Sequence, residues 1–285
     1  MSLGRRIALA SRMVGALPFG VARRLGSFGG RIAARRGVAE GIVERHLARV
    51  GSTASRRDVL ESYGRYWSEA LWASPRRLPE MRERLEVDGH QYFLDAHEGG
   101  RGAVYALPHV GNWEYAAIHP LAYDVPVVAV AERLPDADMG RWITETREMI
   151  GIEIVVLEKG HRTMGRLVEA IGEGAGVALL SDRDLSGNGV EVEFFGETTR
   201  MPQGAIALAE LTGCVVLPVA CLATPTGHRL VIRPPLEIPD APDRSERIRG
   251  GVQALANAFE ELIRLDPTQW HLLQPNWPSD PGYRW

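Results

Sequence analysis

The sequence predicts an α/β protein in which a mostly parallel central sheet is flanked by helices, with a helical region before it. After Gly99 and Gly100, short apolar runs alternate with helical stretches, which is the pattern of βαβ units. Such alternation predicts a parallel sheet that helices cover. The chain has no internal repeat and no linker long enough to separate two domains. We therefore expect one domain over residues 1–285, with a helical N-terminal region (1–98) and an α/β core (99–285).

The elements are expected in the following order. Residues 1–98 are predicted to be helical, with breaks near Pro18, Gly37, 51–55 and 74–75, because glycine and proline interrupt helices. The expected strands are 103–107, 125–131, 153–157, 177–181, 190–195, 215–220 and 229–233. The helices between them are expected from about Gly111 and over 139–150 and 164–171, and a helix over 244–265 precedes a tail rich in Trp and Pro.

The composition is that of an ordinary globular protein. Of the 285 residues, 45% are hydrophobic and 24% are charged, which excludes a disordered or low-complexity chain. Cys214 and Cys221 are the only cysteines, too few for a disulfide framework or a tetrahedral zinc site. We expect a reducing, cytosolic compartment.

The sequence does not predict a membrane-spanning segment. No apolar run is long enough to cross a bilayer, and the uncharged stretch 211–228 is interrupted by Gly213, Pro218 and Pro225. Arg12 interrupts the apolar stretch near the N-terminus, which argues against a secretory signal.

The N-terminal region is strongly basic. Residues 1–50 contain ten arginines and two glutamates, a net charge of +8, so the rest of the chain carries −11. Apolar residues of the first helix recur at spacings of three and four, namely Leu3, Ile7, Ala10, Val14 and Leu17. This stripe fits an interfacial helix on lipid or a helix that packs on its own domain, and periodicity alone favours packing. The chain lacks a nucleic-acid recognition motif, so no nucleic acid partner is expected.

Chemically active side chains follow the ends of three expected strands. His109 follows the first strand of the core after Pro108, and Glu132 and Asp182 come directly after the second and fourth strands. In open parallel sheets, ligands bind beyond the carboxyl ends of the strands, where successive loops converge. We therefore expect an imidazole and carboxylates to meet at one edge of the sheet.

His109 and Glu114 also form an H-x-x-x-x-E pair. Five helical residues turn about 500°, so the two side chains can meet only if His109 lies on the turn before the helix. Gly111 supports such a turn, and the first N–H groups of the helix could then face a developing oxyanion. A histidine in this position can act as a general base, with a carboxylate fixing its tautomer.

Other catalytic motifs are absent or out of context. The glycines at 172, 174 and 176 follow a helix and enter a strand, which is the reverse of a dinucleotide-binding loop. The chain contains no G-x-S-x-G and no H-E-x-x-H sequence, so the serine hydrolase and zinc peptidase classes are not supported.

Several segments, in one order along the chain, resemble the lipid A biosynthesis lauroyl/myristoyl acyltransferase family, and within it the actinobacterial phosphatidylinositol mannoside acyltransferases. The resemblance covers most of the chain after about residue 40. The matching segments are Ser62–Trp67, Leu107–Glu114, Val130–Leu134, Asp182–Leu185, Gly189–Glu197, Arg200–Pro202 and Trp270–Pro275.

The resemblance implies a membrane-associated enzyme without a metal or redox cofactor. It would transfer a fatty acyl group, expected to be palmitoyl, from acyl-CoA to a mannose hydroxyl of a phosphatidylinositol mannoside. In this interpretation His109 is the catalytic base and Asp182 is the carboxylate that partners it. Glu114 takes the acidic position of the motif, and Arg147 orders the site. The residues expected to contact substrate are Glu132, Arg183, Asn112 and Trp113.

The family pattern differs at two positions. The mannoside enzymes carry a longer carboxylate at the position of Asp182 and a shorter one at that of Glu114, so the choice of partner for His109 stays open. The resemblance also favours membrane docking over packing for the basic helices before residue 50. Each Arg near an anionic lipid surface contributes about 1 kcal/mol. The expected location is the cytoplasmic face of the plasma membrane, as a peripheral protein.

Two alternatives remain open. One is an acyltransferase that acts on another glycolipid or on a lysophospholipid, because the H-x-x-x-x-D/E chemistry is shared across acceptors. The other is a non-catalytic protein of the same fold that binds lipid or acyl-CoA.

Overall fold

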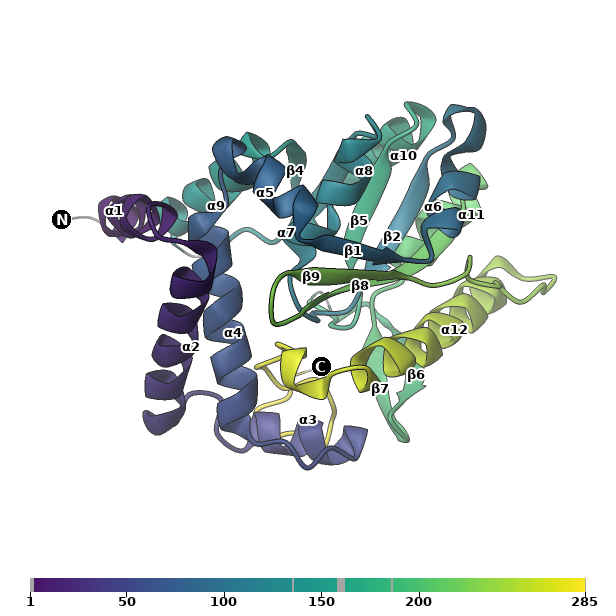
Figure 1. The fold of residues 1–285 in the computed structure, drawn as a ribbon. Helices are drawn as coiled ribbons and strands as arrows, with labels where there is room; N and C mark the ends of the chain where they lie inside the picture. The colour runs from purple at the N-terminus through teal and green to yellow at the C-terminus, as the bar shows by residue number, and fades with distance from the viewer. Residues whose placement is uncertain (1–2, 135, 158–161, 186, 285) are drawn as a thin grey trace.

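The centre of the molecule is a seven-stranded β-sheet. The structure is a computed structural model that describes residues 3–134, 136–157, 162–185 and 187–284. The strands of this sheet are β1 (Leu85–Asp88), β2 (Ala103–Leu107), β3 (Val127–Ala131), β4 (Ile152–Val156), β5 (Gly176–Leu180), β8 (Val216–Ala223) and β9 (His228–Ile232). Their order is β1-β9-β8-β2-β5-β3-β4, and all neighbours are parallel except β8 and β9. The predicted α/β fold with a mostly parallel sheet is confirmed (Figure 1).

Helices cover both faces of this sheet, and a hairpin stands apart from it. The hairpin consists of β6 (Val190–Phe194) and β7 (Glu197–Met201). The helices before β2 are α1 (Leu3–Gly15), α2 (Phe19–Arg35), α3 (Ile42–Val50), α4 (Arg56–Trp72), α5 (Leu78–Glu83) and α6 (His90–His97). Those after it are α7 (Trp113–Ala116), α8 (Ile118–Ala122), α9 (Ala137–Met149), α10 (Arg162–Gly172), α11 (Gly204–Thr212) and α12 (Arg244–Arg264). Short 3₁₀ turns are η1 (Pro75–Arg77), η2 (Glu98–Gly100) and η3 (Pro267–Gln269).

Successive side chains of a strand point to two different cores. Val104 and Ala106 of β2 lie in the core that α10, α11 and α12 complete. Tyr105 and Leu107 lie in the core on the other face, together with residues of α6, α7 and α8. This alternation follows from the pleat of the strand, and it buries β2 on both faces.

The N-terminal helices pack tightly against α4. Gly30 of α2 lies on the backbone of α4, where an added Cβ would come within 1.9 Å of the carbonyl oxygen of Leu60. A glycine is required at this crossing because the two backbones approach too closely for a side chain. Within the described ranges, no helix combines the length and the apolarity needed to cross a bilayer.

The expectation that residues 1–98 are entirely helical is wrong at β1. This strand pairs with β9 in parallel, with Leu85 opposite His228 and Asp88 opposite Val231. Its four residues alternate between half-buried and exposed, as in an edge strand. A strand this short carries little sequence pattern, and its partner lies more than a hundred residues away.

The helix expected near Gly111 is two short helices, α7 and α8, after a tight turn. Gly111 has a φ of +67°, and an added Cβ would come within 2.0 Å of the Cys221 carbonyl oxygen. Only glycine tolerates both the left-handed backbone and the close approach. The turn places His109 outside the helix, as the spacing analysis requires.

Candidate active site

His109 and Asp182 form a hydrogen-bonded pair at the carboxyl edge of the sheet. Leu107 and Leu180 are partners in the parallel register of β2 and β5, so the residues two positions further along each loop lie side by side. Nδ1 of His109 lies 2.5 Å from Oδ1 of Asp182, and the His109 backbone N–H donates to Oδ2 at 2.9 Å. Nε2 is therefore the imidazole atom that can accept a proton, on a side chain that is 24% exposed.

Asp182 is completely buried and is held in its ionised form. Burial by itself raises the pKa of this carboxyl. The charge of His109 and hydrogen bonds from His109 and Trp270 outweigh burial and hold the pKa below its usual value. An ionised carboxylate only accepts hydrogen bonds, so it keeps the proton of His109 on Nδ1. Of the two carboxylates that the sequence leaves open, Asp182 is the one in contact with His109.

Glu114 pairs with Arg147 and Tyr66 instead. Its Oε1 accepts hydrogen bonds from Nε and Nη2 of Arg147 at 3.1 and 2.9 Å, and from the hydroxyl of Tyr66 at 3.1 Å. Burial lowers the pKa of Arg147, but the charge of Glu114 raises it above its usual value. Burial and the same carboxylate raise the pKa of Tyr66. This charged cluster joins α4, α7 and α9 next to the His109 turn.

Replacement of Arg147 by lysine is expected to destabilise the protein by about 1.5 to 3 kcal/mol, because one charge-assisted hydrogen bond to a buried carboxylate is lost. A lysine cannot reproduce the two-pronged contact. We also expect kcat to fall about tenfold as α7 loses its anchor. Urea unfolding and turnover measure the two effects. Arg141→Lys is the matched control, because Arg141 lies on the same helix in an exposed pair with Asp138. Equal effects of the two substitutions would show that Arg147 does not anchor α7 through Glu114.

Asn112 orients α7 from within the protein. Its Oδ1 accepts from the Tyr115 N–H at 3.1 Å, which caps the helix, and its Nδ2 donates to Oε2 of Glu69 at 2.7 Å. Glu69 is 1% exposed and also lies 3.0 Å from Nε of Arg23 and from Nε2 of His228. The sequence predicts a substrate contact for Asn112. The structure places both ends of its amide in protein hydrogen bonds.

The His109 turn leaves few N–H groups for an oxyanion. The backbone N–H groups at positions 110, 111, 112, 115 and 116 all donate to protein oxygen atoms. In this stretch of the described chain, the N–H groups of Trp113 and Glu114 have no such acceptor, and the indole Nε1 of Trp113 is buried without a partner. The Trp113 ring contacts the rings of His109 and Tyr66, at centroid distances of 5.8 and 4.4 Å.

Two predicted substrate contacts lie further out on the same edge. Glu132 is exposed directly after β3, and Arg183 is half-buried directly after Asp182. Among the described residues, neither side chain hydrogen-bonds to the His109 pair. They can meet a ligand from the solvent side of the edge.

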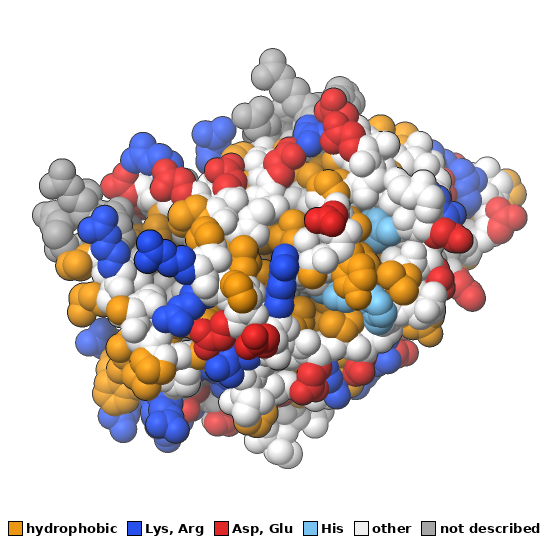
Figure 2. All heavy atoms as spheres, turned by 45° about the horizontal axis from the view of Figure 1, so that its top comes forward, with side chains coloured by type: hydrophobic (Ala, Val, Ile, Leu, Met, Phe, Trp, Pro, Cys, Tyr) orange, Lys and Arg blue, Asp and Glu red, His pale blue; other side chains and the backbone are white. Residues whose placement is uncertain are grey.

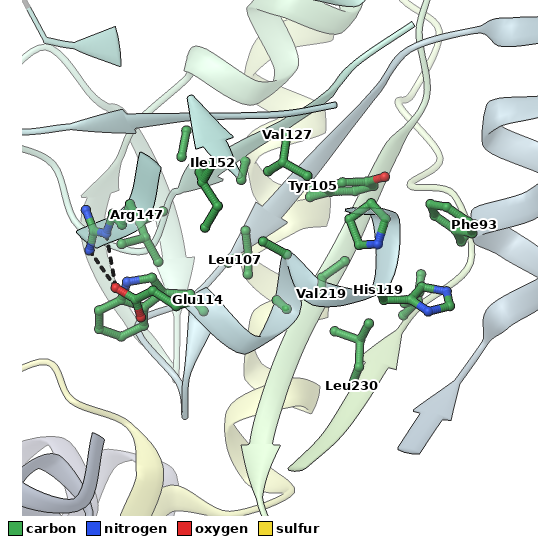
Figure 3. Close-up of a pocket in the computed structure, with 18 of the residues that line it drawn as sticks. Phe93, Tyr105, Leu107, Glu114, His119, Val127, Arg147, Ile152, Val219 and Leu230 are labelled. Carbon is green, nitrogen blue, oxygen red and sulfur yellow. Dashed lines mark hydrogen bonds and ion pairs between the residues drawn. The ribbon is translucent and has the colours of Figure 1, made fainter. Parts of the chain in front are cut away.

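An apolar cavity lies between the sheet and the helices α7 and α8. Figure 3 shows Glu114 and Arg147 at one end of this cavity and Phe93 and His119 at the other. Burial lowers the pKa of His119 to about 4, with a smaller contribution from His90, so this end carries no charge at neutral pH. The wall between the ends includes Leu107, Ala129, Ala178, Leu180, Val219 and Leu230. Between its two ends the cavity is thus lined almost entirely by apolar side chains.

The described residues offer no clear metal site. No three His, Cys, Asp or Glu side chains in the described ranges lie close enough together to hold a metal ion. Cys214 and Cys221 are both free thiols, and burial raises the pKa of each.

A histidine–carboxylate pair beside an apolar cavity is an arrangement typical of enzymes that act on lipid-like substrates. The model of the bacterial lipid A biosynthesis acyltransferase family matches residues 7–279. The chain therefore belongs to this acyltransferase family, and the family resemblance of the motifs is confirmed.

The chain is similar along most of its length to curated members of the family. It is 37% identical over 282 residues to a protein of Mycolicibacterium smegmatis named phosphatidylinositol mannoside acyltransferase, covering 94% of this chain and 89% of that protein. A protein of the same name from Mycobacterium tuberculosis strain CDC 1551 is 37% identical over 282 residues, and the match covers 94% of this chain and 86% of that protein. The one from strain H37Rv is 36% identical over 278 residues, with the same coverage.

Several functional residues lie outside the sequence prediction. Trp270 and Asn276 of the C-terminal tail bond to Asp182, and Tyr66 of α4 bonds to Glu114. Trp270 and Tyr66 lie in segments that match the family motifs, but an aromatic residue in a motif does not reveal which polar group it bonds.

Proposed function

We propose that this protein transfers a fatty acyl group from acyl-CoA to a mannose hydroxyl of a phosphatidylinositol mannoside. The observation that carries the proposal is the His109–Asp182 pair beside the apolar cavity. The names of its relatives supply the acceptor class. A phosphatidylinositol mannoside offers the hydroxyl that such a pair activates.

The proposed step needs one base and one oxyanion site. Nε2 of His109 takes the proton of the sugar hydroxyl while the hydroxyl oxygen bonds to the thioester carbon. The carbonyl electrons move to the oxygen, which the free N–H groups of Trp113 and Glu114 stabilise. The tetrahedral intermediate then expels CoA as a thiolate, which takes up the proton from His109. Asp182 stabilises the imidazolium between these two proton transfers.

The apolar cavity is the proposed site of the acyl chain. It begins at Trp113 and Glu114, the residues that follow the His109 turn, and extends towards Phe93 and His119. A chain bound there presents its thioester to His109. Palmitoyl is the proposed acyl group.

The test is release of free CoA from palmitoyl-CoA by the purified protein, with a phosphatidylinositol dimannoside, with a lysophospholipid, or with no acceptor. Release that requires the mannoside supports the proposal. Release that requires a lysophospholipid instead assigns another acceptor, and release without any acceptor indicates a thioesterase. Binding of palmitoyl-CoA without release from any mixture indicates a non-catalytic binding protein.

The helices α1 and α2 are the proposed membrane contact, on the cytoplasmic side where acyl-CoA is present. Their outer face carries large apolar side chains that are 40 to 64% exposed, namely Leu9, Met13, Val21, Leu25 and Phe28. Figure 2 shows hydrophobic and arginine side chains interspersed over this part of the molecule. Apolar residues among arginines on one helix face suit an interface with anionic lipid.

A double substitution of Leu25 and Phe28 by serine is expected to weaken binding to phosphatidylglycerol-containing vesicles at least about tenfold, because each buried apolar side chain contributes about 1.5 to 3 kcal/mol. Vesicle sedimentation measures the partition. Leu211→Ser is the control, because Leu211 is 56% exposed, like Phe28, but lies on α11. Unchanged partition of the double variant would contradict docking through α2.

A further inference from the structure

A third residue, Trp270 of the C-terminal tail, bonds to the His109–Asp182 pair. We propose that Trp270 is a positioning residue for acyl transfer, because its indole N–H holds Asp182 in the orientation that binds Nδ1 of His109. The Nε1 atom of Trp270 donates to Oδ2 of Asp182 at 2.9 Å, and Oδ1 is left for the imidazole. This inference rests on the proposed role of His109 as the general base.

The C-terminal tail packs along the catalytic loop, which is the turn of residues 108–112 that carries His109. Trp270 forms an antiparallel bridge with Val110, and the backbone N–H of His271 donates to the carbonyl of His109 at 2.7 Å. Nδ2 of Asn276 donates to the backbone carbonyl of Asp182 at 3.1 Å. The tail therefore contacts both members of the pair, through side chain and backbone.

The indole of Trp270 has little freedom to turn away. It is 3% exposed, and its ring packs against His46 at 5.3 Å, Phe195 at 5.7 Å and Trp277 at 6.1 Å. A donor that packing fixes in this way orients its acceptor without further ordering during the reaction. The side chain is thus built as a rigid support for Asp182.

The donor also affects how tightly the pair binds its proton. The bond from Trp270 is one of those that hold the pKa of Asp182 below its usual value against the effect of burial. Without this donor the carboxylate has a higher proton affinity and stabilises the imidazolium more strongly. The catalytic pair then keeps its proton to higher pH, and less of the enzyme carries a free base at a given pH.

The other charged and titratable groups around the pair come from the C-terminal tail, from four helices and from the Asp182 loop. On the tail, burial together with the charges of Arg65 and His109 lowers the pKa of His271 to about 3, so this ring is neutral. The helices contribute Arg65 and Tyr66 of α4, Glu114 of α7, Arg147 of α9 and His46 of α3, which bonds to Asp280 on the far side of Trp270. Arg183 and Asp184 adjoin Asp182 in its own loop.

The test replaces Trp270 by phenylalanine in the full-length protein and records kcat and kcat/KM for CoA release against pH. We expect the acid limb of kcat/KM to move up by about half to one pH unit, and the plateau kcat to fall about tenfold. Incorporation of benzothienylalanine at position 270 keeps the ring size without the N–H. It should move the acid limb as far as phenylalanine does, because both variants lack the donor, whereas a wild-type profile with this residue would assign the phenylalanine effect to packing and overturn the proposal. An unchanged acid limb in both variants would overturn the proposal.

Trp277→Phe is the matched control. Trp277 lies in the same aromatic cluster and is completely buried, and its indole donates to the Phe194 carbonyl at 3.2 Å instead of to Asp182. Trp277→Phe should lower stability without moving the acid limb of kcat/KM. A shift equal to that of Trp270→Phe would show that packing of the tail, and not the donor to Asp182, causes the effect, and would overturn the proposal.

Titration of the His109 imidazole by NMR in wild type and Trp270→Phe gives a readout that needs no turnover. If the wild type releases no CoA, the proposed function fails. The NMR titration still decides whether the indole acts on the pair: an upward shift of the His109 pKa supports it, and identical titrations overturn it.

Discussion

Alanine in place of His109 is expected to lower kcat for acyl transfer by about 10² to 10⁴-fold, which is the usual contribution of a positioned general base. The imidazole is the one group of the Asp182 pair with an atom free to accept a proton, since Nδ1 is engaged with the carboxylate. The KM for palmitoyl-CoA should change less than about threefold, because the base contacts the hydroxyl and not the acyl chain. Continuous detection of free CoA with saturating acceptor measures both constants.

His97→Ala serves as the control for this experiment. His97 lies on α6, where its ring meets the Tyr105 hydroxyl at 2.6 Å and the Arg101 carbonyl at 2.8 Å, and it makes no contact with the His109 pair. Its turnover should stay within about twofold of wild type. Wild-type turnover in the His109→Ala protein would exclude the imidazole as the base.

The position of the His109–Asp182 pair could be predicted from the sequence because it depends on local patterns. Apolar runs mark β2 and β5, and parallel strands end at the same edge of a sheet, so the residues that follow them must converge. The spacing between His109 and Glu114 required the histidine to precede the helix only if the two side chains met, and in the structure Glu114 bonds to Tyr66 and Arg147 instead. Neither pattern contains the distance from His109 to a particular carboxylate, since that distance depends on how two separate loops pack.

The parts that escaped prediction are those that depend on distant partners. The bond from Trp270 to Asp182 joins residues 88 positions apart, and the motif that contains Trp270 does not say which polar group its indole contacts. The strand β7 was not predicted, for a local reason. Its hairpin turns through Phe195 and Gly196, both at positive φ, and a phenylalanine in this position does not resemble the usual Asn-Gly or Asp-Gly turn.

The N-terminal helices are tied to the catalytic loop by one buried carboxylate. Glu69 of α4 forms an ion pair with Arg23 of α2 and hydrogen-bonds to His228 of β9 and to Asn112 at the start of α7. Burial raises the pKa of Glu69, but His228 and Arg23 outweigh it, so the pKa lies below its usual value. A group with a lowered folded-state pKa stabilises the protein fully above its unfolded pKa, and this contribution is lost as the pH falls through the folded value.

Replacement of Glu69 by alanine is therefore expected to lower the free energy of unfolding at pH 7 by about 3 to 5 kcal/mol, because Arg23 and His228 stay buried without their partner. Urea unfolding measures the loss. Glu61→Ala on the same helix is the control, because Glu61 pairs with Arg57 and, at 3.8 Å, with Arg31 of α2 in partly exposed ion pairs, and its loss should cost less than about 1 kcal/mol. The gap between wild type and Glu69→Ala should also narrow below about pH 4.5, as the carboxylate takes up a proton in the unfolded and then in the folded chain. Equal losses in the two variants, or a gap that widens in acid, would mean that Glu69 does not act as a buried anion holding α2 to the catalytic loop.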